Sequence, residues 1–245
     1  AIAEEQFELA FQPQFSAKTE QIIGCEALIR WNRPRPDGKG KDFVRPDIFI
    51  GLAEQSGLIV PIGKWVLETA AQFAYNCRAE GLPDFRVAVN LSGVQFYRDD
   101  IVQRVKDVLE DIKIPPHLLE LEVTESAMMG VLLAVDDFGT GYSSLAYLKR
   151  FPVHRLKIDR AFVMNVTEDA DDAAITQSII QLGHSLDLYV IAEGVETQAH
   201  VDFLREKGCD ELQGYFYSKP VQASEFKGYL RGLVAQSRTK NPVAD

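Results

Sequence analysis

The stretch VLLAVDDFGTG at residues 131–141 carries the strongest structural signal in this chain. Five apolar residues run without a break into Asp136 and Asp137, and a loop with two glycines follows. A continuous apolar run bounded by turn residues is typical of a fully buried strand. Two adjacent carboxylates at its end need positive charge nearby, which divalent cations can supply. The stretch therefore predicts a metal-dependent enzyme built on a buried strand.

Strand-like and helix-like segments alternate along the whole chain. Strands are expected at residues 7–15, 22–31, 85–91, 118–123, 131–135, 155–158, 188–192 and 211–213. Helices are expected at residues 46–55, 61–80, 99–112, 172–186, 198–207 and 224–234, and a polar surface loop at residues 32–42. This alternation predicts an α/β fold of the (β/α)-barrel type, although no helix separates the first two strands. We expect one domain over residues 1–235 and a disordered tail over residues 236–245.

The bulk composition is that of an ordinary globular protein. The formal net charge of −10 argues against general nucleic-acid binding, which needs a basic face. No apolar run approaches the roughly 20 residues of a membrane span, and no signal-peptide pattern is present, so we expect a cytoplasmic protein. The three cysteines have no metal-like spacing and are expected to be buried free thiols.

The join between residues 118–123 and 131–135 is too short for a parallel crossover. Such a connection usually takes at least about 10–12 residues including its helix. Either the two strands are not parallel neighbours, or a segment is missing from the sequence. We favour the second explanation and expect a chain break near residues 129–131.

Polar residues recur where the expected strands end. Barrel enzymes build their active sites from strand ends and the loops that follow, and a buried carboxylate must be paired or bound to metal. Any one glutamate could be a helix cap or a surface charge, but so many from different strands predict one shared site. These residues are Glu26, Asn90, Glu122, Glu125, Asp136, Asp137, Lys157, Asp159, Glu193 and Glu196.

The candidate ligands indicate which metal would bind. Glu26, Asn90, Glu122, Asp136 and Asp137 offer oxygen atoms, and no histidine or cysteine shares their motifs, so Mg²⁺ or Mn²⁺ is favoured over zinc. Two ions roughly 3.5–4 Å apart would fit phosphoryl chemistry. Lys157 is either a partner of the attacking hydroxide or phosphate, or a plain salt-bridge residue. The four histidines fall on expected loops or helices and are interpreted as structural.

Taken in order, the motifs CEALIRW, VNLS, ELEVTES, VDDFGTGYSSL, LKIDR, IAEGVE and LQGYFYSKP closely resemble the EAL-domain cyclic-di-GMP phosphodiesterase family. The resemblance covers residues 7–233. It implies a modified TIM (β/α)8-type barrel with one antiparallel strand. It also implies Mg²⁺- or Mn²⁺-dependent hydrolysis of one phosphodiester bond of cyclic di-GMP, giving linear pGpG, with two ions.

The resemblance assigns roles to individual residues. It implies metal ligation by Glu26, Asn90, Glu122, Asp136, Asp137 and Glu193, with Asp136 bridging the two ions. It implies that Lys157 contacts the nucleophilic water, that Glu193 is the candidate general base, and that Glu125 anchors the DDFGTGYSS loop. The implied nucleotide contacts are Gln12, Gln14, Leu28, Arg30, Asp159, Gln213 and Pro220.

The sequence departs from the family in two places and leaves two alternatives open. The family's helix between ExTE and DDFG is absent, and the loop after EALIRW is longer and more basic. A catalytically silent cyclic-di-GMP receptor would be expected to have substitutions at Glu26, Asn90, Glu122, Asp136, Asp137 or Lys157, and none is present. A dimerising regulatory module of a larger signalling protein is a second alternative, and it is compatible with catalysis. We further expect a homodimer through the DDFGTG loop. The start at Ala1 also favours fusion to sensory or GGDEF-type domains in a longer protein.

Overall fold

A computed structural model describes residues 1–35, 37–123, 132–138 and 153–240, with the backbone alone described for residues 96, 97, 123, 132–138 and 236–240. The strands are β1 (Phe7–Ser16), β2 (Ile22–Pro34), β3 (Lys41–Val44), β4 (Arg86–Leu91), β5 (Leu119–Val123), β6 (Leu132–Phe138), β7 (Arg155–Ile158), β8 (Tyr189–Ala192) and β9 (Glu211–Leu212). The helices are α1 (Pro46–Ser56), α2 (Ile59–Ala79), α3 (Gly93–Arg98), α4 (Ile101–Ile112), α6 (Arg160–Val163), α7 (Ala170–Ser185), α8 (Gln198–Glu206) and α9 (Ala223–Lys240), with 3-10 turns at Ile2–Glu4 and Pro116–Leu118.

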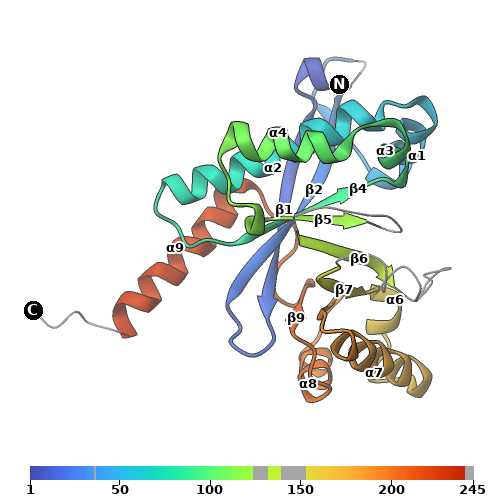
Figure 1. The fold of residues 1–245 in the computed structure, drawn as a ribbon, viewed down its shortest axis with the longest axis vertical. Helices are drawn as coiled ribbons and strands as arrows, with labels where there is room; N and C mark the ends of the chain where they lie inside the picture. The colour runs from blue at the N-terminus through green and yellow to red at the C-terminus, as the bar shows by residue number, and fades with distance from the viewer. Residues whose placement is uncertain (36, 124–131, 139–152, 241–245) are drawn as a thin grey trace, which may run out of the picture.

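Eight of the described strands close into a barrel. Their hydrogen-bonded order is β1-β9-β8-β7-β6-β5-β4-β2, and pairing between β1 and β2 completes the ring. β1 is antiparallel to both neighbours, β2 and β9. The pairs from β2 round to β9 are parallel, and Figure 1 shows β4, β5 and β6 pointing the same way. The expected α/β barrel with one antiparallel strand is therefore confirmed.

Strand alternation sends charged side chains into the barrel and apolar ones outward. Successive residues of a strand face opposite sides of the sheet. On β5, which reads LELEV, Leu119 and Leu121 join the hydrophobic core beneath the helices, whereas Glu120 and Glu122 belong to ion pairs with β7 residues. Because a barrel has one enclosed interior, charged residues from different strands meet there.

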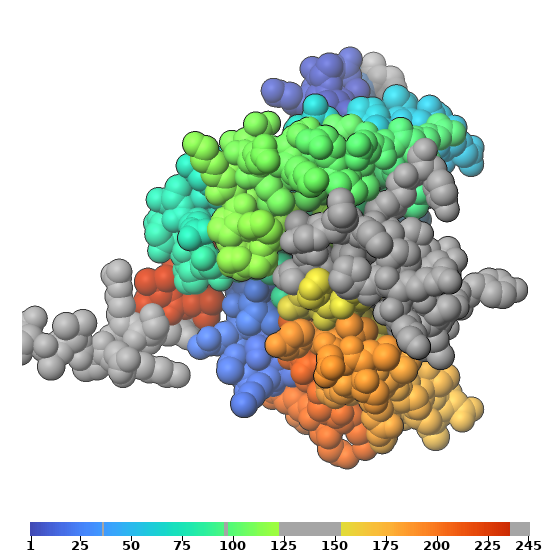
Figure 2. Space-filling model, viewed as in Figure 1, coloured from blue at the N-terminus to red at the C-terminus, as the bar shows by residue number. Residues whose placement is uncertain are grey.

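Two hydrophobic clusters attach the helices to the barrel. One combines Leu67 of α2 and Val105 of α4 with outward-facing residues of β4 and β5. The other packs Ile180 of α7 and Leu204 of α8 against β7 and β8. Figure 1 places α2, α4 and α9 on one side of the strands and α7 and α8 on the other, and Figure 2 shows α4 and α7 at the surface of the same face.

The prediction of a surface loop over residues 32–42 is wrong. β2 continues to Pro34 and pairs with β3 in an antiparallel ladder from Trp31↔Val44 to Pro34↔Lys41. The Pro- and Gly-rich composition marks the turn of this hairpin rather than a loop along its whole length. Proline is tolerated in a strand at an edge or an end, and Pro34 is the last residue of β2.

The pairing between β5 and β6 decides whether these two strands are parallel neighbours, the first alternative raised by the sequence. β5 and β6 are parallel neighbours, paired from Glu120↔Leu132 to Val123↔Val135. The possibility that they are not neighbours is therefore excluded. The expected chain break near residues 129–131 lies outside the described residues.

The helices differ from expectation mainly at their ends. α1 begins at Pro46, as the first-turn proline predicted. α2 starts at Ile59, before Pro61, and the short helices α3 and α6 were not expected. α9 runs to Lys240, so it enters the segment 236–245 that we expected to be a disordered tail.

Candidate active site at the carboxyl ends of the strands

A buried lysine lies in contact with several carboxylates in the barrel interior, near the carboxyl ends of the strands. Nζ of Lys157 on β7 lies 2.7 Å from Oε2 of Glu122 on β5, 2.6 Å from Oε1 of Glu193 after β8, and 3.9 Å from Oε2 of Glu26 on β2. The side chain of Lys157 is 1% exposed, whereas that of Glu193 is 21% exposed. The structure thus brings together four predicted site residues, of which Glu193 lies nearest to solvent.

The carboxylate of Glu26 is held from two further sides. Nδ2 of Asn90 on β4 donates to its Oε1 at 2.7 Å, and Nε2 of Gln213 donates to its Oε2 at 2.6 Å. Gln213 Nε2 also lies 3.3 Å from Oε1 of Gln12, the residue paired with Glu26 across β1 and β2. We call Glu26, Asn90, Glu122, Lys157, Glu193 and Gln213 the upper layer.

The backbone of Gln213, which follows β9, is hydrogen-bonded to the end of β8 and to the segment after it. Its N–H donates to the carbonyl of Ala192, and its own carbonyl accepts from the N–H of Val195. A Cβ atom on the next residue, Gly214, would lie 2.1 Å from the carbonyl oxygen of Val195, so any side chain there would be excluded. This close approach anchors the turn that presents Gln213 to the barrel.

Two of the expected nucleotide contacts lie farther along β2. Leu28, Arg30 and Asn90 line one cavity of about 350 Å³ between β2, β4, α1 and α2. The side chain of Arg30 is half-buried, and burial lowers the pKa of its guanidinium from the usual value. The cavity adjoins the upper layer through Asn90, which belongs to both.

The remaining expected nucleotide contacts have different surroundings. Asp159 is the N-cap of α6, where its Oδ1 accepts from the N–H of Ala161 at 2.7 Å. Pro220 precedes Val221, which forms an antiparallel bridge with Phe11 on β1. Gln14 is fully buried: its amide nitrogen donates to Gln213, and its amide oxygen accepts from Arg86.

Three predicted residues cannot be placed as side chains. Asp136 and Asp137 belong to β6, whose backbone pairs with β5 and β7, but their side chains lie outside the described part of the structure. Glu125 lies entirely outside it. Their roles as metal ligands and loop anchor stay predictions.

A second group of charged residues lies deeper in the barrel and was not predicted. Arg86 contacts Glu120 at 3.2 Å and Glu211 at 2.7 Å, and Arg155 contacts the same two carboxylates at 2.6 Å and 3.1 Å. All four side chains are buried. We call these four residues the lower layer; each cation has two anions and each anion two cations.

Pairing across the lower layer shifts the pKa of Glu211 and that of Arg155 toward their charged forms. Burial alone would raise the pKa of Glu211, but Arg86 and Arg155 together outweigh it and hold that pKa below the usual value of 4.5. For Arg155, burial acts to lower the pKa, while Glu120 and Glu211 raise it above the usual value. A buried ion network of this kind is stable only while every member keeps its partners.

The sequence contains a signal that would have revealed the lower layer. A residue two positions before a predicted site residue faces the same side of the strand. That spacing relates Glu120 to Glu122, Arg155 to Lys157, and Glu211 to Gln213. Arg86 precedes Asn90 by four positions and shares its face.

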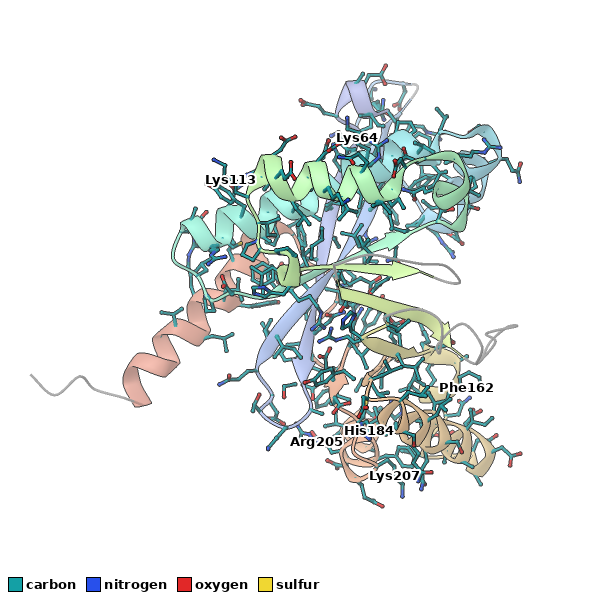
Figure 3. All side chains as sticks on the ribbon, viewed as in Figure 1. Lys64, Lys113, Phe162, His184, Arg205 and Lys207 are labelled. Carbon is teal, nitrogen blue, oxygen red and sulfur yellow. The ribbon has the colours of Figure 1, made fainter. Side chains whose placement is uncertain are left out.

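His184 lies outside the barrel interior, and the three cysteines are buried thiols. His184 on α7 pairs with Asp210 at 3.0 Å, and Figure 3 shows it near Arg205 and Lys207 on the outside of the barrel. The three cysteines are buried and free, as expected. Burial raises the pKa of Cys77 to about 11 and that of Cys209 to about 12, so both stay protonated thiols near neutrality.

The donor atoms of the upper layer fit a hard divalent cation. Glu26, Glu122, Glu193 and Asn90 supply carboxylate and amide oxygens, the ligands that Mg²⁺ and Mn²⁺ prefer. Within the described residues, no three His, Cys, Asp or Glu side chains form a metal site by themselves. The described carboxylates converge on Lys157.

The described residues define an α/β barrel with acidic side chains at its strand ends and a buried lysine among them. A family model described as EAL domain matches residues 1–220, and the chain belongs to this family. The chain is 44% identical over 94% of its length to the signaling protein YkoW of Bacillus subtilis, covering 30% of that protein. It is 42% identical over 92% of its length to the bifunctional diguanylate cyclase/cyclic di-GMP phosphodiesterase MucR of Pseudomonas aeruginosa, covering 34% of that protein.

A solved structure gives the same result. The structure described as "PaMucR Phosphodiesterase, c-di-GMP complex" superposes with a TM-score of 0.85 at 41% identity, covering 92% of this chain and 96% of that one. The chain spans about a third of the length of the curated relatives it matches. None of the helices in the described part is long and apolar enough to cross a bilayer.

Proposed function

We propose that this chain hydrolyses one phosphodiester bond of cyclic di-GMP and releases linear pGpG. The observation that carries the proposal is the convergence of Glu26, Glu122 and Glu193 on the ammonium of Lys157 at the carboxyl ends of the barrel strands. Active sites of such barrels occupy this end. Membership of the EAL family and the cyclic-di-GMP complex of the MucR phosphodiesterase support the substrate.

The proposed metal ligands are Glu26, Asn90, Glu122, Asp136, Asp137 and Glu193, for Mg²⁺ or Mn²⁺ and for two ions. Ions bound there would neutralise the carboxylates and stabilise charge that develops on the phosphate. Asn90 now turns its Nδ2 toward Glu26. Its Oδ1 is therefore the atom available to a cation.

The chain's own residues would then position water and phosphate. In the hydrolysis, a water oxygen bonds to phosphorus, the bond to the 3′ oxygen breaks, and that oxygen takes up a proton. Glu193 is the proposed acceptor of the proton lost by water, because it is the most exposed of the three carboxylates around Lys157. Lys157 donates to Glu122 and holds positive charge beside the reacting phosphate.

Substrate contacts and partners complete the proposal. We assign nucleotide binding to the cavity lined by Leu28 and Arg30, because a guanidinium can hold a phosphate bidentately. Gln12, Asp159, Gln213 and Pro220 are further candidates. A homodimer through the DDFGTG loop, anchored by Glu125, is also proposed, as are a cytoplasmic location and fusion to sensory or GGDEF-type domains.

The deciding experiment is incubation of the chain with cyclic di-GMP and Mg²⁺ or Mn²⁺, followed by chromatography for pGpG. We expect pGpG to form and to disappear on addition of a chelator. A parallel binding isotherm with Ca²⁺ separates two failures. Binding without any pGpG would support a catalytically silent receptor, and absence of both would contradict cyclic di-GMP as the ligand.

A further inference from the structure

The two layers of the barrel interior are joined by a chain of hydrogen bonds. Arg86 Nη2 donates to Oε1 of Gln14 at 2.8 Å, and Nε2 of Gln14 donates to Oε1 of Gln213 at 3.0 Å. Nε2 of Gln213 then donates to Oε2 of Glu26 at 2.6 Å. Arg86 belongs to the lower layer and Glu26 to the upper one, so two glutamines span the distance between them.

The direction of this chain is fixed at both ends. A guanidinium has donors and no acceptor, whereas an ionised carboxylate has acceptors and no donor. Arg86 therefore requires the oxygen of the Gln14 amide, and Glu26 requires the nitrogen of the Gln213 amide. With both ends set, the two amides can meet in one orientation, nitrogen of Gln14 to oxygen of Gln213.

The backbone makes room for the first link. Gln14 on β1 pairs with Gly24 on β2, and Gly24 pairs with Arg86 on β4. The side chain of Gln14 thus crosses over Gly24 to reach a residue two strands away. A Cβ atom at position 24 would lie 2.8 Å from Gln14 Oε1, closer than real Cβ contacts, and 3.0 Å from the carbonyl oxygen of Arg86, tighter than most of them.

We propose that Gln14 is a positioning residue, which orients the carboxylate of Glu26 by holding the Gln213 amide in the register set by Arg86. It is fully buried, so it acts through Gln213 rather than on nucleotide. The inference rests on the proposed function for its effect on turnover. Its effects on Glu26 orientation and on metal affinity do not need hydrolysis to occur.

The matched variants are Gln14→Met, Gln14→Glu and Gly24→Ala. Gln14→Met keeps the length and removes both polar atoms. In Gln14→Glu, residue 14 has acceptor atoms only. Gln213 must then turn its amide nitrogen toward residue 14 and its amide oxygen toward Glu26. This oxygen repels the Glu26 carboxylate. Cys25→Ala is the control, because Cys25 is buried on β2 between Gly24 and Glu26 and faces the outer hydrophobic core.

The first measurement is the Kd for Mn²⁺ without nucleotide, together with separate kcat and KM values for cyclic di-GMP. Loss of an outer partner of a metal ligand typically weakens affinity about 10–100-fold. We expect a loss of Mn²⁺ affinity in that range for Gln14→Met and Gly24→Ala, and a larger loss for Gln14→Glu. In these three variants we expect kcat to fall and KM to stay unchanged. The control Cys25→Ala should keep wild-type Mn²⁺ affinity.

The second measurement is the metal-free crystal structure of Gln14→Glu, where we expect Glu26 to leave its contact with Gln213. This readout decides the matter even if wild-type protein forms no pGpG or binds no Mn²⁺. A change in KM alone would make Gln14 a nucleotide contact and overturn the proposal. Unchanged Mn²⁺ affinity together with an unmoved Glu26 would also overturn it.

Discussion

The lower and upper layers of the barrel interior differ in how their charges balance. In the lower layer, Arg86 and Arg155 face Glu120 and Glu211, and each charge is satisfied within the group. Among the described residues of the upper layer, three carboxylates contact the ammonium of Lys157. A balanced buried network needs nothing more, whereas an excess of buried carboxylate is costly unless a cation or proton joins it. Among the described side chains, the two layers therefore differ in the ratio of carboxylates to cations, and this difference distinguishes the proposed active site from the lower layer.

The largest expected effect comes from removing the shared ammonium. We expect Lys157→Met to lower kcat at least about a hundredfold, the size typical of losing a charge-stabilising donor in a transition state. Steady-state kinetics with saturating Mg²⁺ measures it. Lys64→Met is the control, because Lys64 is exposed on α2 and pairs with Glu68 at 3.7 Å. A Lys157 variant with wild-type kcat would remove the lysine from the mechanism.

The corresponding change in the lower layer should affect stability instead. Arg155→Met leaves Glu120 and Glu211 with Arg86 as their shared cation. Breaking a buried ion pair on one side costs about 3–5 kcal/mol. We expect urea denaturation to show a loss of that size, with kcat per folded molecule unchanged. A large fall in kcat without a loss of stability would mean that the two layers are not functionally distinct.

A double variant sharpens the comparison further. Arg155→Met combined with Glu120→Gln removes one charge of each sign, so the remaining Arg86 and Glu211 still match. We expect the combined loss of stability to be smaller than the sum of the single losses by about 1–3 kcal/mol. Simple additivity in the denaturation data would argue that the four residues do not act as one network.

The smallest expected effect is a pH dependence. The folded-state pKa of Glu211 is lowered, so its contribution to stability is complete above pH 4.5 and is lost as the pH falls through the folded value. The free energy of unfolding should therefore fall more steeply below pH 4.5 in wild type than in Glu211→Gln. Parallel curves for the two proteins would show that Glu211 is not stabilised as an anion.

The sequence predicted the barrel and much of the upper layer correctly. Glu26, Asn90, Glu122, Lys157 and Glu193 end or follow buried strands in recognisable motifs, and the structure brings them within contact of one another. Strand ends converge in a barrel by topology alone, so this prediction needed no packing detail. Whether the same residues bind metal stays a prediction.

The lower layer was missed because the sequence analysis looked for site residues at strand ends, whereas these four residues lie farther back along the strands. Arg155 and Glu120 lie inside expected strands, and each shares a face with a predicted site residue two positions later. The burial of Gln14 could not be read from FQPQ, since it depends on the absence of a side chain at Gly24 on another strand. Contacts of that kind are set by register, which the sequence pattern leaves open.

The reversed direction of β1 has a topological consequence. In a regular barrel the first strand begins at the end of the barrel opposite the active site. The two ends of a strand are separated by about 3.3 Å for each residue of its length. Here Phe7, the first residue of β1, pairs with Trp31 beyond Arg30 on β2, and Trp31 Nε1 donates to Gln6. Phe7 also packs against Phe49 and Trp65. The N-terminal end of β1 and the proposed active site therefore lie at the same end of the barrel, and β1 runs from there along β2, the strand that carries Glu26.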